Sequence, residues 1–252
     1  MNKALFTLLC MLGQLVLLSA CNGIMGGIYD EAPEEERTEY GFVKHDESTG
    51  RGRLYLEVVS YKKWVYIDLH KRKIQSINIP EGLSGQWDGK SGVSYMQVTW
   101  PSTFERKELI RTDAMPSPSQ WDFALHHYDV RTHRGAALET HYSSIDELLR
   151  QGNRAELLGQ TFVKDIWSDH WAYQDLTGIF NYYIGYHNTE YNPVLSRWMD
   201  MRVQNPPPTY HPSGKVYLLR LQDGSVAALH FSNYMSPAGV KGYVSIDYVY
   251  PY

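Results

Sequence analysis

Apolar and polar residues alternate with a period of two along most of the chain after residue 52. In the first such segment, Leu54, Leu56 and Val58 occupy every second position. This alternation is typical of strands with one buried and one solvated face. Segments with this pattern, or with a short continuous apolar run, are 53–60, 64–69, 73–79, 92–100, 121–132, 179–186, 216–221, 225–233 and 242–250. They predict one all-β domain built from antiparallel sheets.

Two local signals refine this prediction. The Asp-Gly pair at 223–224 separates two apolar runs and predicts a β-hairpin, because its turn requires a positive φ. One segment instead has helical spacing, with Ser144 as the N-cap, Ile145 and Leu148 on one face, and Gly152 as the stop. We therefore expect one short helix in an otherwise β-sheet domain. The proline run at 206–208 predicts a loop, since proline cannot donate to a strand ladder.

The N-terminus has the pattern of a secretory signal. Lys3 precedes an apolar run at 4–18 that is too short to span a membrane comfortably. The run ends in Leu-Ser-Ala-Cys21, which resembles a bacterial lipobox, where cleavage precedes a cysteine that carries diacylglycerol. The sequence thus predicts a signal peptide at 1–20, lipidation of Cys21, and anchoring in an outer membrane by lipid alone. The alternative is an ordinary signal peptide with a chance cysteine.

Residues 21–52 are predicted to form a flexible acidic tether, because they are rich in Gly and Glu and have few apolar positions. Residues 53–252 would then form the folded domain. Both cysteines of the chain, Cys10 and Cys21, lie before it. A disulfide, an iron–sulfur cluster, a cysteine zinc site and a cysteine nucleophile are therefore excluded within the domain.

The charge and motif content exclude several functional classes. The 24 Lys and Arg against 28 Asp and Glu give a net charge of −4, which leaves no electrostatic footprint for nucleic acid. Neither a phosphate-binding glycine loop nor a Gly-x-Ser-x-Gly nucleophile motif is present. In a regular strand, His126 and His127 point to opposite faces, so a zinc site of these two with His133 would require a bulge. We expect no enzyme activity.

Four segments carry a resemblance to a known family. Residues 121–132, WDFALHHYDVRT, closely resemble the W-D-x-A-L/F-H-R-Y-D-V-R motif of the HmuY family of haem-binding outer-membrane lipoproteins of the Bacteroidetes. Residues 61–66, YKKWVY, resemble its early Y-x-x-W-x-Y strand. The segments 208–217 and 223–251 resemble its P-T-Y…V-F/Y element and its closing hairpin. The resemblance extends over nearly the whole predicted domain.

The resemblance implies a sandwich-like all-β HmuY fold that holds one haem between two side chains on projecting finger-like elements. The haem would then pass to a TonB-dependent outer-membrane receptor, so the implied function is that of a haemophore in iron acquisition. Haem is a flat apolar macrocycle with two free axial positions on its iron. An apolar crevice can bury the ring, and two axial side chains can saturate the metal.

The resemblance also suggests axial ligands before and after Trp198. His170 falls within one residue of the first ligand position. The second position corresponds to Val203, which cannot ligate. Met199 and Met201 precede it on the same face of a predicted strand, and some family members use methionine sulfur. We therefore expect His170 and Met201 as the axial pair, with Met199 as a further candidate. The alternative is that His170 is a surface histidine and that both methionines fill the core.

His187 and Tyr210 remain fallback donors, whereas the resemblance makes His126 a structural position. Two other functions stay open. A surface glycan-binding lipoprotein would use exposed aromatic side chains, and the chain has 20 Tyr and 7 Trp. A protein that keeps the HmuY scaffold but has lost haem ligation would account for Val203. Exposed aromatics on one face would favour the glycan reading, whereas aromatics around buried donors would favour haem.

Overall fold

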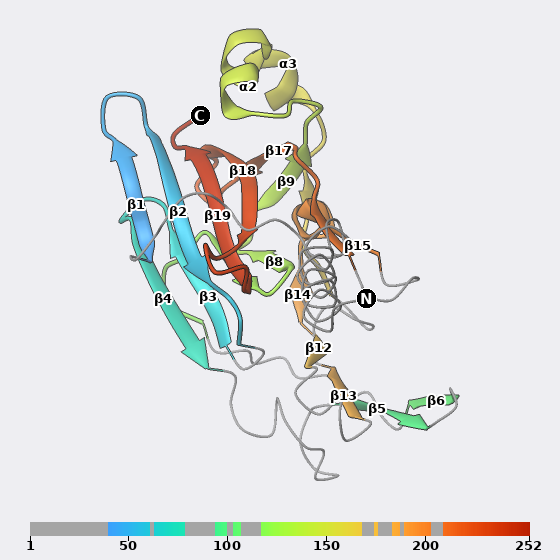
Figure 1. The fold of residues 1–252 in the computed structure, drawn as a ribbon. Coiled ribbons are helices and arrows are strands. Elements are labelled where there is room, and N and C mark those ends of the chain that lie inside the picture. The colour runs from blue at the N-terminus through green and yellow to red at the C-terminus, as the bar shows by residue number, and fades with distance from the viewer. Residues whose placement is uncertain are drawn as a thin grey trace, which may run out of the picture.

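The computed structural model describes residues 40–60, 63–78, 94–99, 103–106, 117–167, 174–175, 183–186, 189–202 and 209–252 (Figure 1). Of these, 94–99, 103–106, 174–175, 183–186 and 201–202 are described at the level of the backbone. The fold is mostly antiparallel β-sheet. Within the described part, none of the helices has the length and apolar character needed to cross a membrane.

A seven-stranded antiparallel sheet is the largest element of the fold. Its strands follow the order β1-β2-β19-β18-β17-β9-β10. Their bounds are β1 Gly41–Asp46, β2 Arg51–Glu57, β19 Lys241–Val249, β18 Val226–Met235, β17 Val216–Arg220, β9 Ala136–Glu139 and β10 Val163–Lys164. The chain therefore closes by placing its last strand between the N-terminal hairpin and the penultimate strand, which ties both ends of the described domain together.

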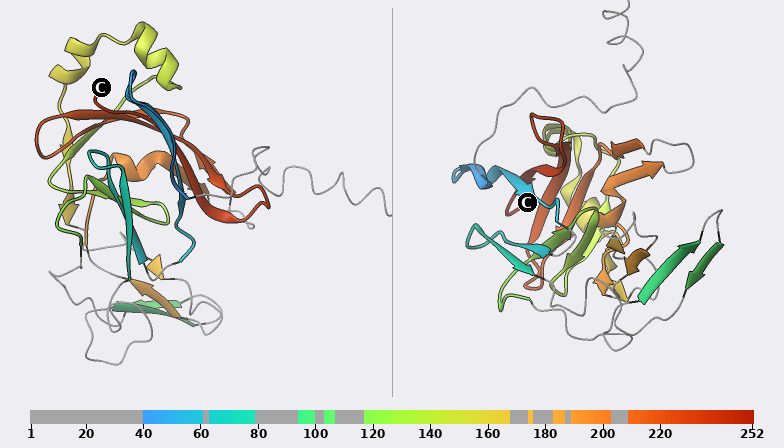
Figure 2. Two further views of the ribbon diagram at one scale, coloured as in Figure 1. Left: turned by 90° about the vertical axis from the view of Figure 1, so that its left-hand side faces the viewer. Right: turned by 60° about the horizontal axis from the view of Figure 1, so that its bottom comes forward.

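A four-stranded antiparallel sheet packs against one face of the large sheet. Its order is β4-β3-β7-β8, with β4 Lys73–Asn78, β3 Lys63–Asp68, β7 Phe123–His126 and β8 Asp129–Thr132. Figure 2 shows the two sheets at separate levels, with the helices beyond the opposite face of the large sheet. The arrangement is the sandwich-like, mostly β fold that the sequence predicts.

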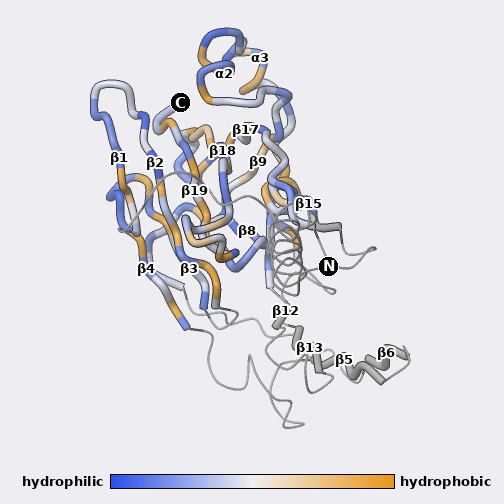
Figure 3. The backbone as a smooth tube through the Cα atoms, viewed as in Figure 1, coloured by the Kyte–Doolittle hydropathy of each residue, from blue (hydrophilic) through white to orange (hydrophobic). Residues whose placement is uncertain are grey.

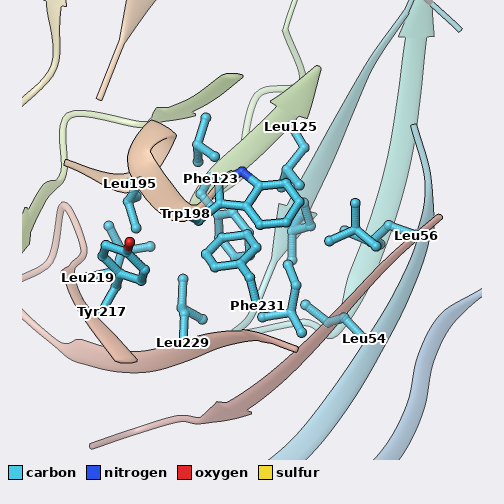
Figure 4. Packing of buried hydrophobic residues seen from close by; sticks show 14 of the residues in the cluster. Leu54, Leu56, Phe123, Leu125, Leu195, Trp198, Tyr217, Leu219, Leu229 and Phe231 are labelled. Atoms are coloured by element: carbon cyan, nitrogen blue, oxygen red, sulfur yellow. The ribbon is translucent and has the colours of Figure 1, made fainter. Parts of the chain in front are cut away.

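The main core fills the space between the two sheets. Leu54 and Leu56 of β2 point into it from the large sheet, and Phe123 and Leu125 of β7 point into it from the small one. Trp198 lies among them and stacks on Phe231 with 4.7 Å between ring centroids (Figure 4). In Figure 3 the hydrophobic positions are concentrated on the strands of these two sheets.

Alternate residues of the strands face away from this core. Val216 and Leu218 of β17 pack under two helices, α2 Ile145–Gln151 and α3 Arg154–Gly159, and so form a second core. Ser144 caps α2 by accepting a hydrogen bond from the backbone N–H of Glu147, as the sequence predicts. The second helix corrects the expectation of one helix. Its signal is Asn153, whose side chain accepts from the backbone N–H of Glu156.

Three smaller sheets complete the described part. β12 Gln174–Asp175, β13 Tyr183–Tyr186, β5 Ser94–Thr99 and β6 Thr103–Arg106 form one, and β11 Ile166–Trp167 pairs with β14 Glu190–Tyr191. The third is the hairpin of β15 Met199–Arg202 and β16 Thr209–Pro212, which directly follows the 3-10 helix η2 Leu195–Trp198. The proline run at 206–208 lies outside the described residues.

Two boundaries differ from the sequence-based expectations. β1 lies within 21–52, so the expected tether is too long, and the described fold already begins with Gly41. The expected long strand at 121–132 is a hairpin in which His127 and Tyr128 form the turn between β7 and β8. His127 has φ 49°, a left-handed conformation that the pattern of apolar residues does not encode.

Candidate functional site

The predicted axial ligands are only partly within the described residues. His170 and Val203, like the fallback donor His187, lie outside them. Met201 lies in β15, where its backbone pairs with Tyr210 of β16. Met199 opens the same strand, and its side chain is 6% exposed and belongs to the main core. Among the two methionines, the described packing therefore gives Met199 the core-filling role that is common for this residue.

The start of β15 is fixed to the hairpin that carries the longest resemblance motif. Trp198, at the end of η2, is fully buried and donates from Nε1 to the backbone carbonyl of Tyr128 at 2.9 Å. Ser196 of η2 donates to the carbonyl of Val130 and accepts from its N–H at 3.0 Å. These bonds hold η2 against β8. They give β15 and β16 a rigid base on the sandwich.

Tyr210 on β16 belongs to a small aromatic group beside this base. Its ring stacks on Tyr128 with 5.5 Å between centroids and approaches Tyr234 at 6.1 Å. The ammonium of Lys241 lies 4.0 Å from the Tyr210 ring centroid. A cation and an aromatic face at this distance attract each other. The ring of Tyr210, the fallback donor, is thus packed by partners within the protein.

The motif at 121–132 supplies a buried cluster that is structural in character. The guanidinium of Arg131 lies 4.8, 5.2 and 5.1 Å from the ring centroids of Trp64, Tyr66 and Trp121. It donates to the hydroxyls of Tyr66 and Thr189, the latter at 3.1 Å. Burial lowers the pKa of Arg131, and the aromatic faces and hydroxyls offset its lost hydration. The residues that carry the resemblance therefore build the scaffold.

His126 and His127 do come close together, although not through a bulge. Their ring centroids lie 5.1 Å apart across the β7–β8 turn. His126 is 1% exposed and packs on Trp64 at 5.4 Å. Burial lowers the pKa of His127 to about 4. His133 lies elsewhere and stacks on Trp121 at 5.0 Å, with 9° between the planes. The three histidines therefore do not converge on one point among the described residues.

A cavity of about 810 Å³, with mostly polar and charged residues in its lining, opens beside the motif. The end of β3 and the residues before β7 line it, together with the β17–β18 turn. Three side chains meet there, Asp68, His70 and Asp122, and each offers one donor atom within 4.8 Å of the others. This group is not evident from the sequence pattern, because Asp122 is 52 residues from His70. The Asp-x-His spacing at the end of a predicted strand was the available signal.

The pKa values of the carboxylates and the imidazole at this cavity are shifted from their ordinary values. Burial, with the charge of Asp68 as a smaller cause, raises the pKa of Asp122, although the backbone N–H of Leu69 and the imidazole of His70 act in the opposite direction. Burial lowers the pKa of His70, but Asp223 and Asp122 outweigh it, so the net shift is upward. The hydroxyl of Ser225 and then His70 lower the pKa of Asp223 to about 2.

Comparison with known proteins places the fold. A family model described as HmuY protein matches residues 60–248. A solved structure described as that of a HmuY-like haem-binding protein from Bacteroides vulgatus is 34% identical, with a TM-score of 0.65, and the match covers 85% of this chain and 99% of that one.

A lipoprotein structure from Bacteroides fragilis is 32% identical, with a TM-score of 0.66, covering 86% and 98%. The apo HmuY analogue of Tannerella forsythia shares the fold at 18% identity, with a TM-score of 0.56, covering 87% and 97%. No curated protein matches the chain. The family match over three quarters of the sequence, together with the shared sandwich, shows that this chain belongs to the HmuY family.

Proposed function

We propose that this protein is a haem-binding lipoprotein that holds haem between His170 and Met201. The observation that supports the proposal is the anchoring of the β15–β16 hairpin at its base. Trp198 anchors that base, and Met201 lies three residues further along the chain. Met199 packs in the main core. Of the two methionines of β15, we therefore assign Met201 as the ligand of the haem iron. A HmuY-like relative that is described as haem-binding supports haem as the bound molecule.

The chemistry suits haem. A histidine nitrogen and a methionine thioether together saturate both axial positions, which holds the metal without opening it to oxygen chemistry. Positions 199 and 201 share a face of β15, because successive residues of a strand alternate between faces. The haem would lie beyond the end of the sandwich core and would pass to a TonB-dependent receptor. The protein acts by binding and transport.

Hemin titration of the purified protein tests the proposal. We expect saturation at one haem per chain with a Soret band of a low-spin, six-coordinate iron. His170→Ala and Met201→Ala should each weaken binding and change the spectrum. Matched controls are His211→Ala, an exposed histidine of β16, and Met235→Leu, a methionine of the main core. Unchanged spectra in both ligand variants would reject this axial pair, and absence of any binding would reject the haem function.

We also propose that Cys21 carries the lipid anchor in the outer membrane. A relative described as a lipoprotein, 32% identical over most of both chains, supports this part of the proposal. Membrane fractionation should recover the wild-type protein with the outer membrane, and mass spectrometry should find diacylglycerol on the N-terminal peptide. Cys21→Ala should leave the protein unlipidated. An unmodified Cys21 in the native protein would reject the anchor.

The alternative of glycan binding finds little support in the described residues. Glycan platforms require several exposed aromatic rings on one face. Among the described Trp, Tyr and Phe side chains, Tyr40 alone is exposed, at 60%. It stacks on Tyr55 with 5.5 Å between centroids, which occupies one of its faces. A single ring of this kind is not a platform, so the described residues do not support glycan binding.

A further inference from the structure

The strand ladder between β3 and β7 brings two aspartates together. Ile67 pairs with Phe123, and the N–H of Asp122 donates to the carbonyl of Ile67 at 2.8 Å. Asp68 and Asp122 are therefore neighbours at the end of the ladder, and both line the 810 Å³ cavity. Backbone hydrogen bonds fix the positions of these two residues, so the two backbone positions stay adjacent as long as the sheet is formed.

Both carboxylates are largely buried, and no Lys or Arg of the described residues forms an ion pair with either. Asp68 is 7% exposed, and the side chain of Asp122 is 10% exposed. Asp68 accepts one hydrogen bond at Oδ1, from the backbone N–H of Lys71, whereas the Lys71 ammonium is bonded to Gln120. Two buried carboxylates are costly when both are charged, and the imidazole of His70 is the one basic side chain that the described residues pair with them. A bound cation would remove this cost.

The third member, His70, faces the pair in a manner suited to metal ligation. Its Nδ1 lies 3.4 Å from Oδ2 of Asp122, which is long for a hydrogen bond. Two ligand atoms bound at about 2.1 Å to one tetrahedral ion lie about 3.4 Å apart, which matches this separation. The other ring nitrogen, Nε2, lies 2.9 Å from Oδ2 of Asp223. A carboxylate in this position fixes the tautomer of a ligating imidazole and its orientation.

We propose that Asp68, His70 and Asp122 bind a divalent transition-metal ion of the Zn²⁺ class and that Asp223 is the positioning residue for His70. One imidazole and two carboxylates suit Zn²⁺ or Mn²⁺, whereas Ca²⁺ and Mg²⁺ prefer oxygen ligands alone. The cavity leaves the fourth coordination position open to water. The site lies at the β3–β4 turn and is separate in the chain from the proposed haem ligands, so it does not depend on haem binding.

Calorimetric titration of the EDTA-stripped, haem-free protein with Zn²⁺ tests this proposal. We expect one ion per chain, and an increase in the thermal unfolding midpoint on saturation, because a ligand of the folded state stabilises that state. Asp68→Asn and His70→Ala should abolish both effects. His141→Ala is the matched control, since His141 is exposed and is not part of the cavity lining, and the variant should bind as the wild type does.

Asp223→Asn separates positioning from folding. It should lower the Zn²⁺ affinity by about 10–100-fold while the metal-free unfolding midpoint stays close to that of the wild type. Titration with Co²⁺ gives a second readout, because the visible d–d bands report the ligands directly and should be lost in His70→Ala. The proposal is overturned if the wild type does not bind Zn²⁺, or if binding and the Co²⁺ bands persist in both Asp68→Asn and His70→Ala.

Discussion

The indole Nε1 of Trp198 donates a 2.9 Å hydrogen bond to the backbone carbonyl of Tyr128. This bond joins the end of η2 to the turn between β7 and β8, two segments that are 70 residues apart. The same indole fills the middle of the main core and stacks on Phe231. A single side chain therefore links the packing of the sandwich to the strand that carries Met201.

We expect Trp198→Phe to destabilise the protein by about 1–3 kcal/mol and Trp198→Ala by about 3–5 kcal/mol. The phenyl ring retains part of the packing but removes the indole hydrogen bond to the carbonyl of Tyr128, whereas alanine also leaves a cavity. Urea denaturation followed by circular dichroism measures both values. The exposed Tyr40 provides a control, because Tyr40→Phe should change stability by less than about 0.5 kcal/mol. Equal stability of Trp198→Phe and wild type would contradict this view of the bond.

Arg131 should be far more sensitive to substitution than an exposed arginine. Arg131→Ala removes a cation that packs on three aromatic rings and bonds two hydroxyls, so we expect a loss of about 3 kcal/mol. Arg197, which is exposed on η2, is the matched control, and Arg197→Ala should stay within about 0.5 kcal/mol of wild type. Thermal and urea unfolding of both variants test the difference. Similar losses at the two positions would show that the aromatic cluster contributes little.

The N-cap of α2 allows a test with a conservative control. The Ser144 hydroxyl accepts from the N–H of Glu147 at 3.1 Å, so Ser144→Ala should cost about 1 kcal/mol. Ser144→Asp keeps an acceptor at the same place and adds a negative charge at the helix N-terminus, which is favourable. It should therefore retain wild-type stability. If both variants lost the same amount, the side-chain cap would not be the cause.

Asp247 should contribute to acid stability. Burial raises the pKa of Asp247, but the neighbouring His230 and Arg53 outweigh it and bring the pKa to about 2. A carboxyl whose pKa is lower in the folded state stabilises that state above its unfolded pKa of 3.8, and the contribution disappears as the pH falls through about 2. We expect about 2 kcal/mol at neutral pH. Asp247→Asn should be less stable by this amount at pH 7, and the gap should close in acid. A gap that does not change with pH would contradict the expectation.

The sequence predicts this fold best where local signals are strong. Ser144 and Gly152 mark the ends of α2, and the turn at 222–224 has the positive φ at Gly224 that an Asp-Gly pair indicates. The sequence of β1, GFVKHD, has little apolar character and therefore favours a tether rather than a strand. The strand is held by pairing with β2, which a linear pattern does not reveal.

The candidate site was less predictable, for physical reasons. His170 and Met201 are candidate ligands through the resemblance alone, and no pattern of spacing could have suggested them, because haem ligands come from separate elements. Asp68 and His70 meet Asp122 only through the pairing of β3 with β7. The turn at His127 is likewise hidden in the sequence, because a positive φ is uncommon for residues other than glycine and apolar positions continue on both sides of it, at Leu125 and Tyr128.

His127 should make the protein lose stability as the pH falls from neutral to mildly acidic values. Burial lowers the pKa of His127 from 6.5 to about 4, and the charge of Glu57 opposes this only in part. A buried histidine whose pKa is lowered on folding favours the neutral form, so stability is full above the unfolded pKa of 6.5 and falls as the pH drops toward 4. The loss from this residue is at most about 3 kcal/mol.

His127→Asn removes this titration and keeps a residue that tolerates the left-handed conformation of the turn. We expect the variant to lose less stability than the wild type when the pH is lowered from 7 to 4.5, as measured by urea denaturation at each pH. Carboxyl groups common to both proteins cancel in this comparison, so the difference isolates the imidazole. His141→Asn, at an exposed histidine, should leave the pH dependence unchanged. If His127→Asn and the wild type lost the same free energy of unfolding, protonation of the His127 imidazole would not destabilise the folded state, which would contradict the prediction.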